Sequence, residues 1–216
     1  MTAAVPKAEL HVHLEGTATP DLVRRIAQRN ISVAIAKVAP DPAQQALIRR
    51  EIFEHPEWHE FDRGTIDVEK ATTHFGARAG LSADQMRALL QTANESLHPI
   101  AGTVRLVEDL AAAGVHLYVL SNMPVSTYQY LTRRHEFFGH FRELVISGAI
   151  LMIKPEPAIY KHLVDKTGIV PAESVFIDDL LKNVVAAREC GLHAIQFQGP
   201  DAARAELRAY LPHANL

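Results

Sequence analysis

The stretch "SVFIDDLLKNVVAARECGLHAIQFQ", Ser174 to Gln198, decides the fold class of this chain. It opens with a short apolar segment that ends in two acidic residues, which is typical of a buried β-strand. A segment of helical character follows and closes at Gly191, and "HAIQFQ" then returns to the composition of a strand. A strand, a helix and a second strand in this order predict a βαβ unit, in which the two strands are parallel.

Predicted strands and helices also alternate upstream of this unit, back to about residue 98. The segment "GTVRLVEDLAAAG" has apolar residues at helical spacing, and "VHLYVLSN" follows as a strand that ends in polar residues. Three further segments continue the pattern: a helix in "VSTYQYLTRRHEFF", a short strand in "ELVISG" and a helix in "PEPAIYKHLVDKTG". These units predict an α/β protein with a parallel sheet.

The N-terminal part of the chain is expected to add one strand to this sheet. "AELHVHL" has the alternation of a strand, and "TPDLVRRIAQRN" after it has the pattern of a helix. Residues 40–97 carry helical segments and little strand pattern, and Ser82 with Gln85 forms a capping box at the start of one helix. We therefore expect a core of residues 1–39 and 98–216, with residues 40–97 inserted after the first strand as a helical cap.

The composition is that of a soluble globular protein. Hydrophobic residues make up 48% of the 216 residues, and the net charge is −3. This charge gives no electrostatic reason to expect binding to nucleic acid or to a membrane. Cys190 is the only cysteine, and the N-terminus lacks the pattern of a secretory signal, so we expect a cytoplasmic protein. The oligomeric state cannot be read from the sequence.

Polar residues follow two of the predicted strands where those strands end. Ser121 and Asn122 end one strand, Asp178 and Asp179 end another, and Lys154 stands just before a predicted helix. Ligands of open parallel sheets bind beyond the carboxyl ends of the strands. A hydroxyl, a lysine and two acids at that edge suit a phosphate group and Mg²⁺. The alternative is structural, because such residues also cap helices and form turns.

The order of these segments resembles the haloacid dehalogenase superfamily of phosphatases over about residues 40 to 210. The cues are "LYVLSN", "IKPEPAIY" and "VFIDDLLKNVVAAREC", together with the cap-like "FEHPEWHEFDRGTID". The resemblance implies a Rossmannoid three-layer fold and Mg²⁺-dependent hydrolysis of a small phosphorylated metabolite. It also implies that Ser121 and Asn122 hold the phosphoryl oxygens and that Lys154 balances their charge. Asp179 would then ligate Mg²⁺, and Asp178 would support the lysine or the metal.

The first motif of that superfamily, Asp-x-Asp, is missing upstream of the predicted cap. The segment "HLEGT" aligns with the family pattern Asp-x-Asp-Gly-Thr. This alignment puts His13 at the position of the nucleophile and Glu15 at that of the acid/base. Because Glu is one methylene longer than Asp, its carboxyl group would be displaced from the position that the chemistry requires. Two hypotheses follow: a phosphatase whose activity is weak or lost, or an inactive relative that binds its ligand without turnover.

The segment "VPKAELHVHLEGTATPDLVRRIAQRN" resembles the start of adenosine and adenine deaminases. That resemblance implies that His11 and His13 ligate a catalytic Zn²⁺ and that Glu15 contacts the substrate. Two histidines fall short of the three or four ligands that a zinc site needs. A deaminase-like fragment is therefore the second alternative. A fusion of two genes, or a misassigned start that joined two reading frames, is another origin for this segment.

Overall fold

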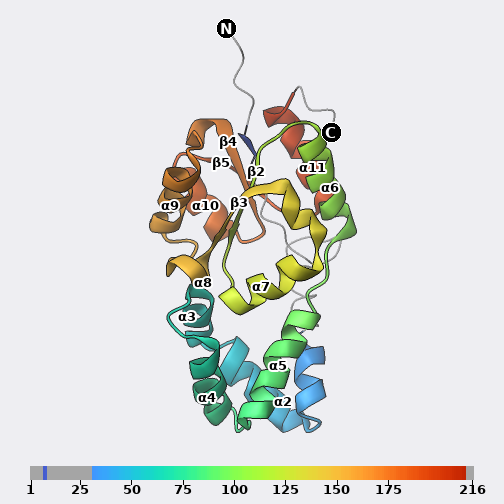
Figure 1. The fold of residues 1–216 in the computed structure, drawn as a ribbon, viewed down its shortest axis with the longest axis vertical. Helices are drawn as coiled ribbons and strands as arrows, with labels where there is room; N and C mark the ends of the chain where they lie inside the picture. Colours follow the sequence, from blue (N-terminus) through green and yellow to red (C-terminus); the bar gives the residue numbers. More distant parts are fainter. Residues whose placement is uncertain (1–6, 9–30, 213–216) are drawn as a thin grey trace.

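Parallel strands form the centre of the upper part of the molecule in Figure 1, which draws a computed structural model that describes residues 7–8 and 31–212. Strand β4 pairs with β1 on one side and β5 on the other, and β2 pairs with β3, in each case in parallel. Strand β1 also contacts β2, which brings the two sets of strands together. The strands are β1 (Lys7–Ala8), β2 (Leu117–Ser121), β3 (Phe141–Ile146), β4 (Ser174–Asp178) and β5 (His193–Gln196).

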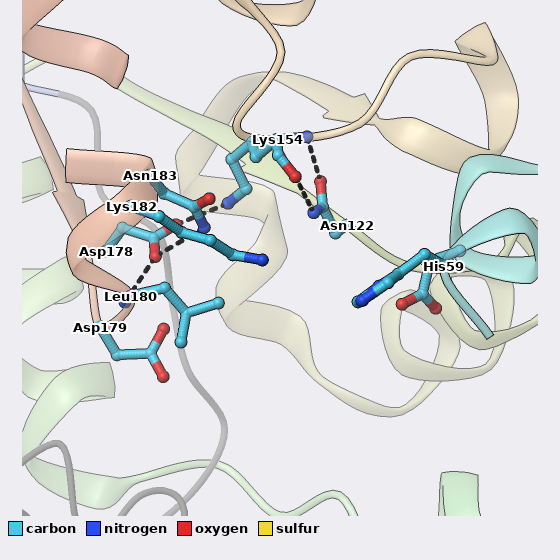
Figure 2. A pocket seen from close by; sticks show the side chains of 9 residues that line it. His59, Asn122, Lys154, Asp178, Asp179, Leu180, Lys182 and Asn183 are labelled. Atoms are coloured by element: carbon cyan, nitrogen blue, oxygen red, sulfur yellow. Dashed lines mark hydrogen bonds and ion pairs between the residues drawn. The ribbon is translucent and has the colours of Figure 1, made fainter. Parts of the chain in front are cut away.

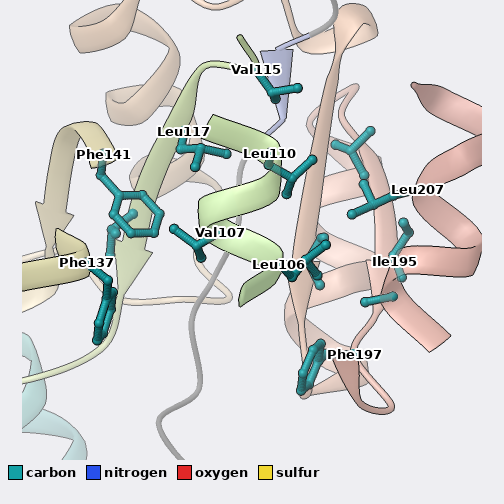
Figure 3. Close-up of a cluster of buried hydrophobic side chains, with 14 of the residues drawn as sticks. Leu106, Val107, Leu110, Val115, Leu117, Phe137, Phe141, Ile195, Phe197 and Leu207 are labelled. Carbon is teal, nitrogen blue, oxygen red and sulfur yellow. The ribbon is translucent and has the colours of Figure 1, made fainter. Parts of the chain in front are cut away.

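Helices cover both faces of this sheet. Successive side chains of β2 point to opposite faces: Val119 packs in the cluster of α6 and α11, and Leu120 in the cluster of α9 and α10. Figure 3 shows the first cluster, in which Leu106 of α6 and Leu207 of α11 face the strands. Burial on both faces explains the apolar runs within these strands, such as residues 175–177 of β4. The core helices are α6 (Ala101–Ala112), α7 (Val125–Arg134), α8 (Ser147–Ile150), α9 (Pro157–Thr167), α10 (Leu181–Glu189) and α11 (Pro200–Tyr210).

The helices between residues 31 and 95 form a separate layer with its own hydrophobic cluster, which we call the cap. The indole ring of Trp58 packs in this cluster against Phe53 and Phe61, at centroid distances of 4.8 and 5.3 Å. Ala34 and Ile35, which precede the predicted cap boundary, pack in it as well. The cap contains a helix at residues 31–38, then α2 (Pro42–Ile48), α3 (Glu57–Arg63), α4 (Val68–Arg78) and α5 (Ala83–Glu95).

The predicted α/β fold with a parallel sheet is confirmed. The capping box at α5 is also present, because the Ser82 hydroxyl accepts from the Gln85 backbone N–H and the Gln85 side-chain oxygen Oε1 accepts from the Ser82 backbone N–H. Four of the described α-helices were not predicted: the helix at residues 31–38, α3, α8 and α11. Helix α3 has seven residues and no side-chain N-cap, so it carries little local signal. Within the helical segments expected at residues 40–97, α2 continues as a π-helical turn, Arg49–Phe53.

Of the predicted first strand at residues 8–14, only Ala8 lies within the described residues. Together with Lys7 it forms β1, which pairs with Ser174 and Val175 of β4. The predicted helix at residues 19–30 lies outside them. None of the described helices combines the length and the apolar character needed to cross a membrane.

Candidate functional site

A pocket of about 190 Å³ lies between the carboxyl ends of the strands and the cap. Figure 2 shows the side chains that line it. Four of the residues singled out from the sequence meet here, which are Asn122, Lys154, Asp178 and Asp179. Ser121 is buried at the end of β2 and is not among the lining residues. The candidates His11, His13 and Glu15 lie outside the described residues.

Lys154 and Asp178 form a buried ion pair at the base of this pocket. The Lys154 ammonium group donates to Asp178 Oδ2 at 2.8 Å and to the Leu120 carbonyl at 2.6 Å. Each of the two side chains is only 1% exposed. A buried charge is costly unless it is paired and hydrogen-bonded, and here both charges are. The pair therefore holds a fixed cation at the edge of the sheet.

Asp178 is also bound on its other oxygen. Its Oδ1 accepts from the Leu180 N–H and from the Asn183 side-chain amide, both at 2.9 Å. These bonds tie the carboxylate to the beginning of α10, where exposed backbone N–H groups favour a negative charge. Asp178 thus acts in this structure as the group that orients Lys154, which is one of the two roles that the resemblance implied for it.

The Asn122 side chain clamps the backbone of Lys154. Its amide donates to the Lys154 carbonyl at 3.0 Å, and its carbonyl oxygen accepts from the Lys154 N–H at 2.9 Å. Both ends of the side chain are therefore engaged with one peptide segment. Asn122 fixes the position of the lysine, and its predicted contact with a phosphoryl group stays a prediction.

Asp179 and Asn183 are the oxygen donors that suit a metal ion in this pocket. Asp179 is half-buried and lines the pocket, and the Oδ1 atom of Asn183 is buried and accepts no hydrogen bond from the described residues. Within residues 7–8 and 31–212, no three acidic, histidine or cysteine side chains cluster as metal ligands. Mg²⁺ does not require such a cluster, because it binds one or two carboxylates together with waters and substrate oxygens. The residues present thus fit Mg²⁺. The alternative Zn²⁺ site at His11 and His13 stays a prediction.

The cap supplies two further residues that sequence reasoning missed, His59 and Asp62 of α3. They are three residues apart and therefore lie on the same face of the helix. Burial raises the pKa of the Asp62 carboxyl to about 8, so this acid is protonated at neutral pH. The third missed residue is Lys182 of α10, whose side chain points toward His59 across the pocket in Figure 2. From the sequence, His59 and Asp62 could have been placed in one site only if residues 57–63 had been recognised as a helix.

The end of α3 is fixed to the core at three successive residues. The Ser147 hydroxyl donates to the Asp62 carbonyl at 2.5 Å, and Arg63 donates to both oxygens of Glu156 at 2.8 and 2.5 Å. The hydrogen bonds from Arg63 hold the pKa of the Glu156 carboxyl below its usual value. Gly64 follows at a φ of +91° with its Cα against the backbone of Gly148. The cap wall of the pocket is therefore held in place on the core.

The Arg63–Glu156 pair should contribute measurably to stability, and this contribution should depend on salt. Both side chains are partly exposed, so we expect a coupling free energy of about 0.5–1 kcal/mol at low salt. In 1 M NaCl the coupling should fall toward zero, because exposed charges are screened. Urea unfolding of Arg63→Ala, Glu156→Ala and the double variant measures the coupling at both salt concentrations. A coupling of zero at low salt would contradict this expectation.

The sequence profile of haloacid dehalogenase-like hydrolases matches residues 59–191, which is more than half of the chain. The sesquiterpene phosphatase astK of Aspergillus oryzae is 28% identical over 151 residues, which cover 70% of this chain and 77% of that protein. The enolase-phosphatase E1 of Granulibacter bethesdensis is 27% identical over 206 residues, 88% of this chain and 84% of that protein. A flavin mononucleotide hydrolase of Arabidopsis thaliana is 26% identical over 169 residues, 77% of this chain and 68% of that protein.

Solved structures have the same fold. A haloacid dehalogenase family enzyme of Bacteroides thetaiotaomicron, solved as a magnesium complex, superposes with a TM-score of 0.68 at 18% identity, over 91% of this chain and 95% of that one. The L-2-haloacid dehalogenase of Xanthobacter autotrophicus gives a TM-score of 0.63 at 17% identity, over 94% and 83% of the two chains. The resemblance of the N-terminal segment to deaminases stays a prediction. The site at the strand ends, the cap and the match over residues 59–191 lead to one conclusion: this chain belongs to the haloacid dehalogenase-like hydrolase family.

Proposed function

We propose that this protein hydrolyses the phosphate ester of a small metabolite with the help of Mg²⁺. The observation that carries the proposal is the buried Lys154–Asp178 pair, which shares a capped pocket with Asp179. Three relatives named as phosphatases or as a hydrolase of flavin mononucleotide support this type of reaction. An anionic ester is the ligand that a fixed cation at a sheet edge would attract.

Lys154 would neutralise the phosphoryl group in this reaction. Its ammonium group lies in the pocket and is fixed by Asp178 and the Leu120 carbonyl, so it requires no reorganisation when an anion binds. Asn122 would act through Lys154 by holding its backbone, and Ser121 is proposed to bind a phosphoryl oxygen as the resemblance implies.

Asp179 and the amide oxygen of Asn183 would hold the metal ion, with Asp178 as the carboxylate behind Lys154. When bound, Mg²⁺ neutralises negative charge on the phosphoryl oxygens. Asp179 would also orient the phosphate ester relative to Lys154, since both side chains line the same small pocket.

The nucleophile is assigned by the register of "HLEGT" with the first motif of the family. His13 would attack phosphorus as the bond to the leaving oxygen breaks, and Glu15 would give its proton to that oxygen. Water would then attack the phosphohistidine and release inorganic phosphate. These two assignments rest on the sequence alone.

The second candidate is a relative that binds phosphate esters without turnover. The missing Asp-x-Asp motif favours it, because imidazole and a longer acid replace both reacting carboxylates. In that case His13→Asp combined with Glu15→Asp should create activity where the unchanged protein has none.

Hydrolysis of p-nitrophenyl phosphate by the full chain tests the proposal. We expect turnover with Mg²⁺, none with excess EDTA, and a loss of about 10²-fold or more in kcat/KM for Asp179→Asn, because a metal ligand is removed. Asp201→Asn on the exposed face of α11 is the matched control and should leave the rate unchanged. An unchanged protein without metal-dependent turnover on p-nitrophenyl phosphate and a panel of sugar phosphates would rule out the proposed hydrolysis.

A further inference from the structure

The two walls of the pocket differ in chemistry. The core wall carries the lysine and the carboxylates that suit a phosphate group, whereas the cap wall carries His59 and Asp62, which the proposed hydrolysis does not use. A phosphoryl group held by Lys154 leaves the organic part of the ester to meet the residues opposite. Figure 2 shows His59 on the side opposite Lys154 and Asp178. The cap wall is therefore the part of the pocket that would contact the leaving group.

Hydrogen bonds to the core fix the backbone of Asp62 at this wall. Its carbonyl accepts from the Ser147 hydroxyl, and the next residue, Arg63, is bound through both carboxylate oxygens of Glu156. A side chain on such a fixed helix end can present its carboxyl at a defined position. The hydrogen bond from Ser147 engages the backbone carbonyl of Asp62, so it leaves the side-chain carboxyl available to a ligand.

The protonation state of Asp62 makes it a donor as well as an acceptor. Because burial raises its pKa to about 8, the carboxyl carries a proton below that pH and can donate it to an oxygen of the substrate. On α3 its titratable neighbours are His59, Glu60 and Arg63. The core contributes Lys154, Asp178, Asp179 and Lys182 to the same pocket. Above pH 8 the ionised acid would add a negative charge to a pocket that has to accept a phosphate ester.

We propose that Asp62 and His59 select the organic part of the substrate by hydrogen bonding to its hydroxyl groups. This inference rests on the proposed hydrolysis and names its substrate class: phosphate esters of hydroxylated compounds, such as polyols. Leu180 is the one apolar residue among the nine that line the pocket within the described chain. An apolar leaving group, such as a terpenyl chain, would leave the polar cap residues without partners, and a site of this kind rejects such a ligand strongly.

Glycerol 3-phosphate and propyl phosphate test the inference, because they share a three-carbon chain and differ in two hydroxyl groups. We expect the full chain to prefer glycerol 3-phosphate by about 10²-fold in kcat/KM. Asp62→Leu should reduce this preference at least tenfold through KM, and Asp62→Asn, which keeps a donor, should preserve most of it. Glu69→Leu on the exposed face of α4 is the control and should not alter the preference.

The pH dependence gives a second readout. For the unchanged protein the preference should fall above about pH 8, where Asp62 loses its proton, and for Asp62→Asn it should stay constant through that range. Equal use of both esters by the unchanged protein, or an unaltered preference in Asp62→Leu, would overturn the inference and leave the proposed hydrolysis standing. If no ester is hydrolysed, calorimetric binding of the two esters gives the same comparison, with equal affinities refuting the inference.

Discussion

Replacing Lys154 with Met is expected to lower the free energy of unfolding by about 3–5 kcal/mol, because it leaves the buried Asp178 carboxylate without its cation. Hydrogen bonds from the Leu180 N–H and the Asn183 amide remain, but they do not neutralise the charge. Hydrolysis should be lost together with stability, since the same ammonium group is proposed to face the phosphoryl group. Urea unfolding followed by circular dichroism measures the first effect.

Lys161→Met is the matched control for this experiment. Lys161 forms an exposed ion pair with Asp165 one turn along α9, and such pairs contribute only about 0.3–0.5 kcal/mol. Adding Asp178→Asn to Lys154→Met should recover part of the lost stability, because the unpaired charge is then removed. A loss below about 1 kcal/mol in Lys154→Met would mean that Asp178 does not depend on the lysine.

Replacing Gly64 with Ala should loosen the cap from the core. The residue has a φ of +91°, and a Cβ atom there would lie 2.3 Å from the Gly148 carbonyl oxygen, where two backbone segments meet. The unfavourable backbone conformation and the clash together should cost about 2–4 kcal/mol of unfolding free energy. Because the neighbouring Asp62 and Arg63 would move with α3, kcat/KM should fall as well.

Gly80→Ala separates the two causes. Gly80 also has a positive φ, +67°, but a Cβ atom there meets nothing within 4 Å. This variant should lose only the conformational part, about 1–2 kcal/mol, and should keep its activity. Equal losses in the two variants, with equal activity, would show that the contact between Gly64 and Gly148 does not matter for the cap.

The core of the fold could be predicted because its signals are local. The strands from Leu117 onward carry apolar runs, the helices between them have the 3.6-residue period, and turns at residues such as Gly114 and Gly191 separate them. The short helix α3 could not be predicted in this way. It is stabilised by aromatic packing inside the cap and by bonds to Ser147 and Glu156, which lie far away in the sequence.

In the candidate site, too, part of the arrangement could be predicted from local signals and part could not. Residues at strand ends, such as Asn122 and Asp178, could be grouped because the carboxyl ends of parallel strands share one edge. Their separate tasks could not be assigned, because adjacent acids look alike in a sequence. The structure distinguishes Asp178, which is buried and bound to Lys154 and to the start of α10, from Asp179, which is half-buried in the same pocket.

Trp58 gives this protein a built-in optical probe. It is the only tryptophan among the 216 residues, and its indole packs against Phe53 and Phe61 within α3 and its surroundings. The same helix carries His59 and Asp62 into the pocket. A ligand that shifts α3 will therefore alter the emission of a single, known fluorophore. Rapid mixing can follow ligand capture by the cap in real time, without an attached dye.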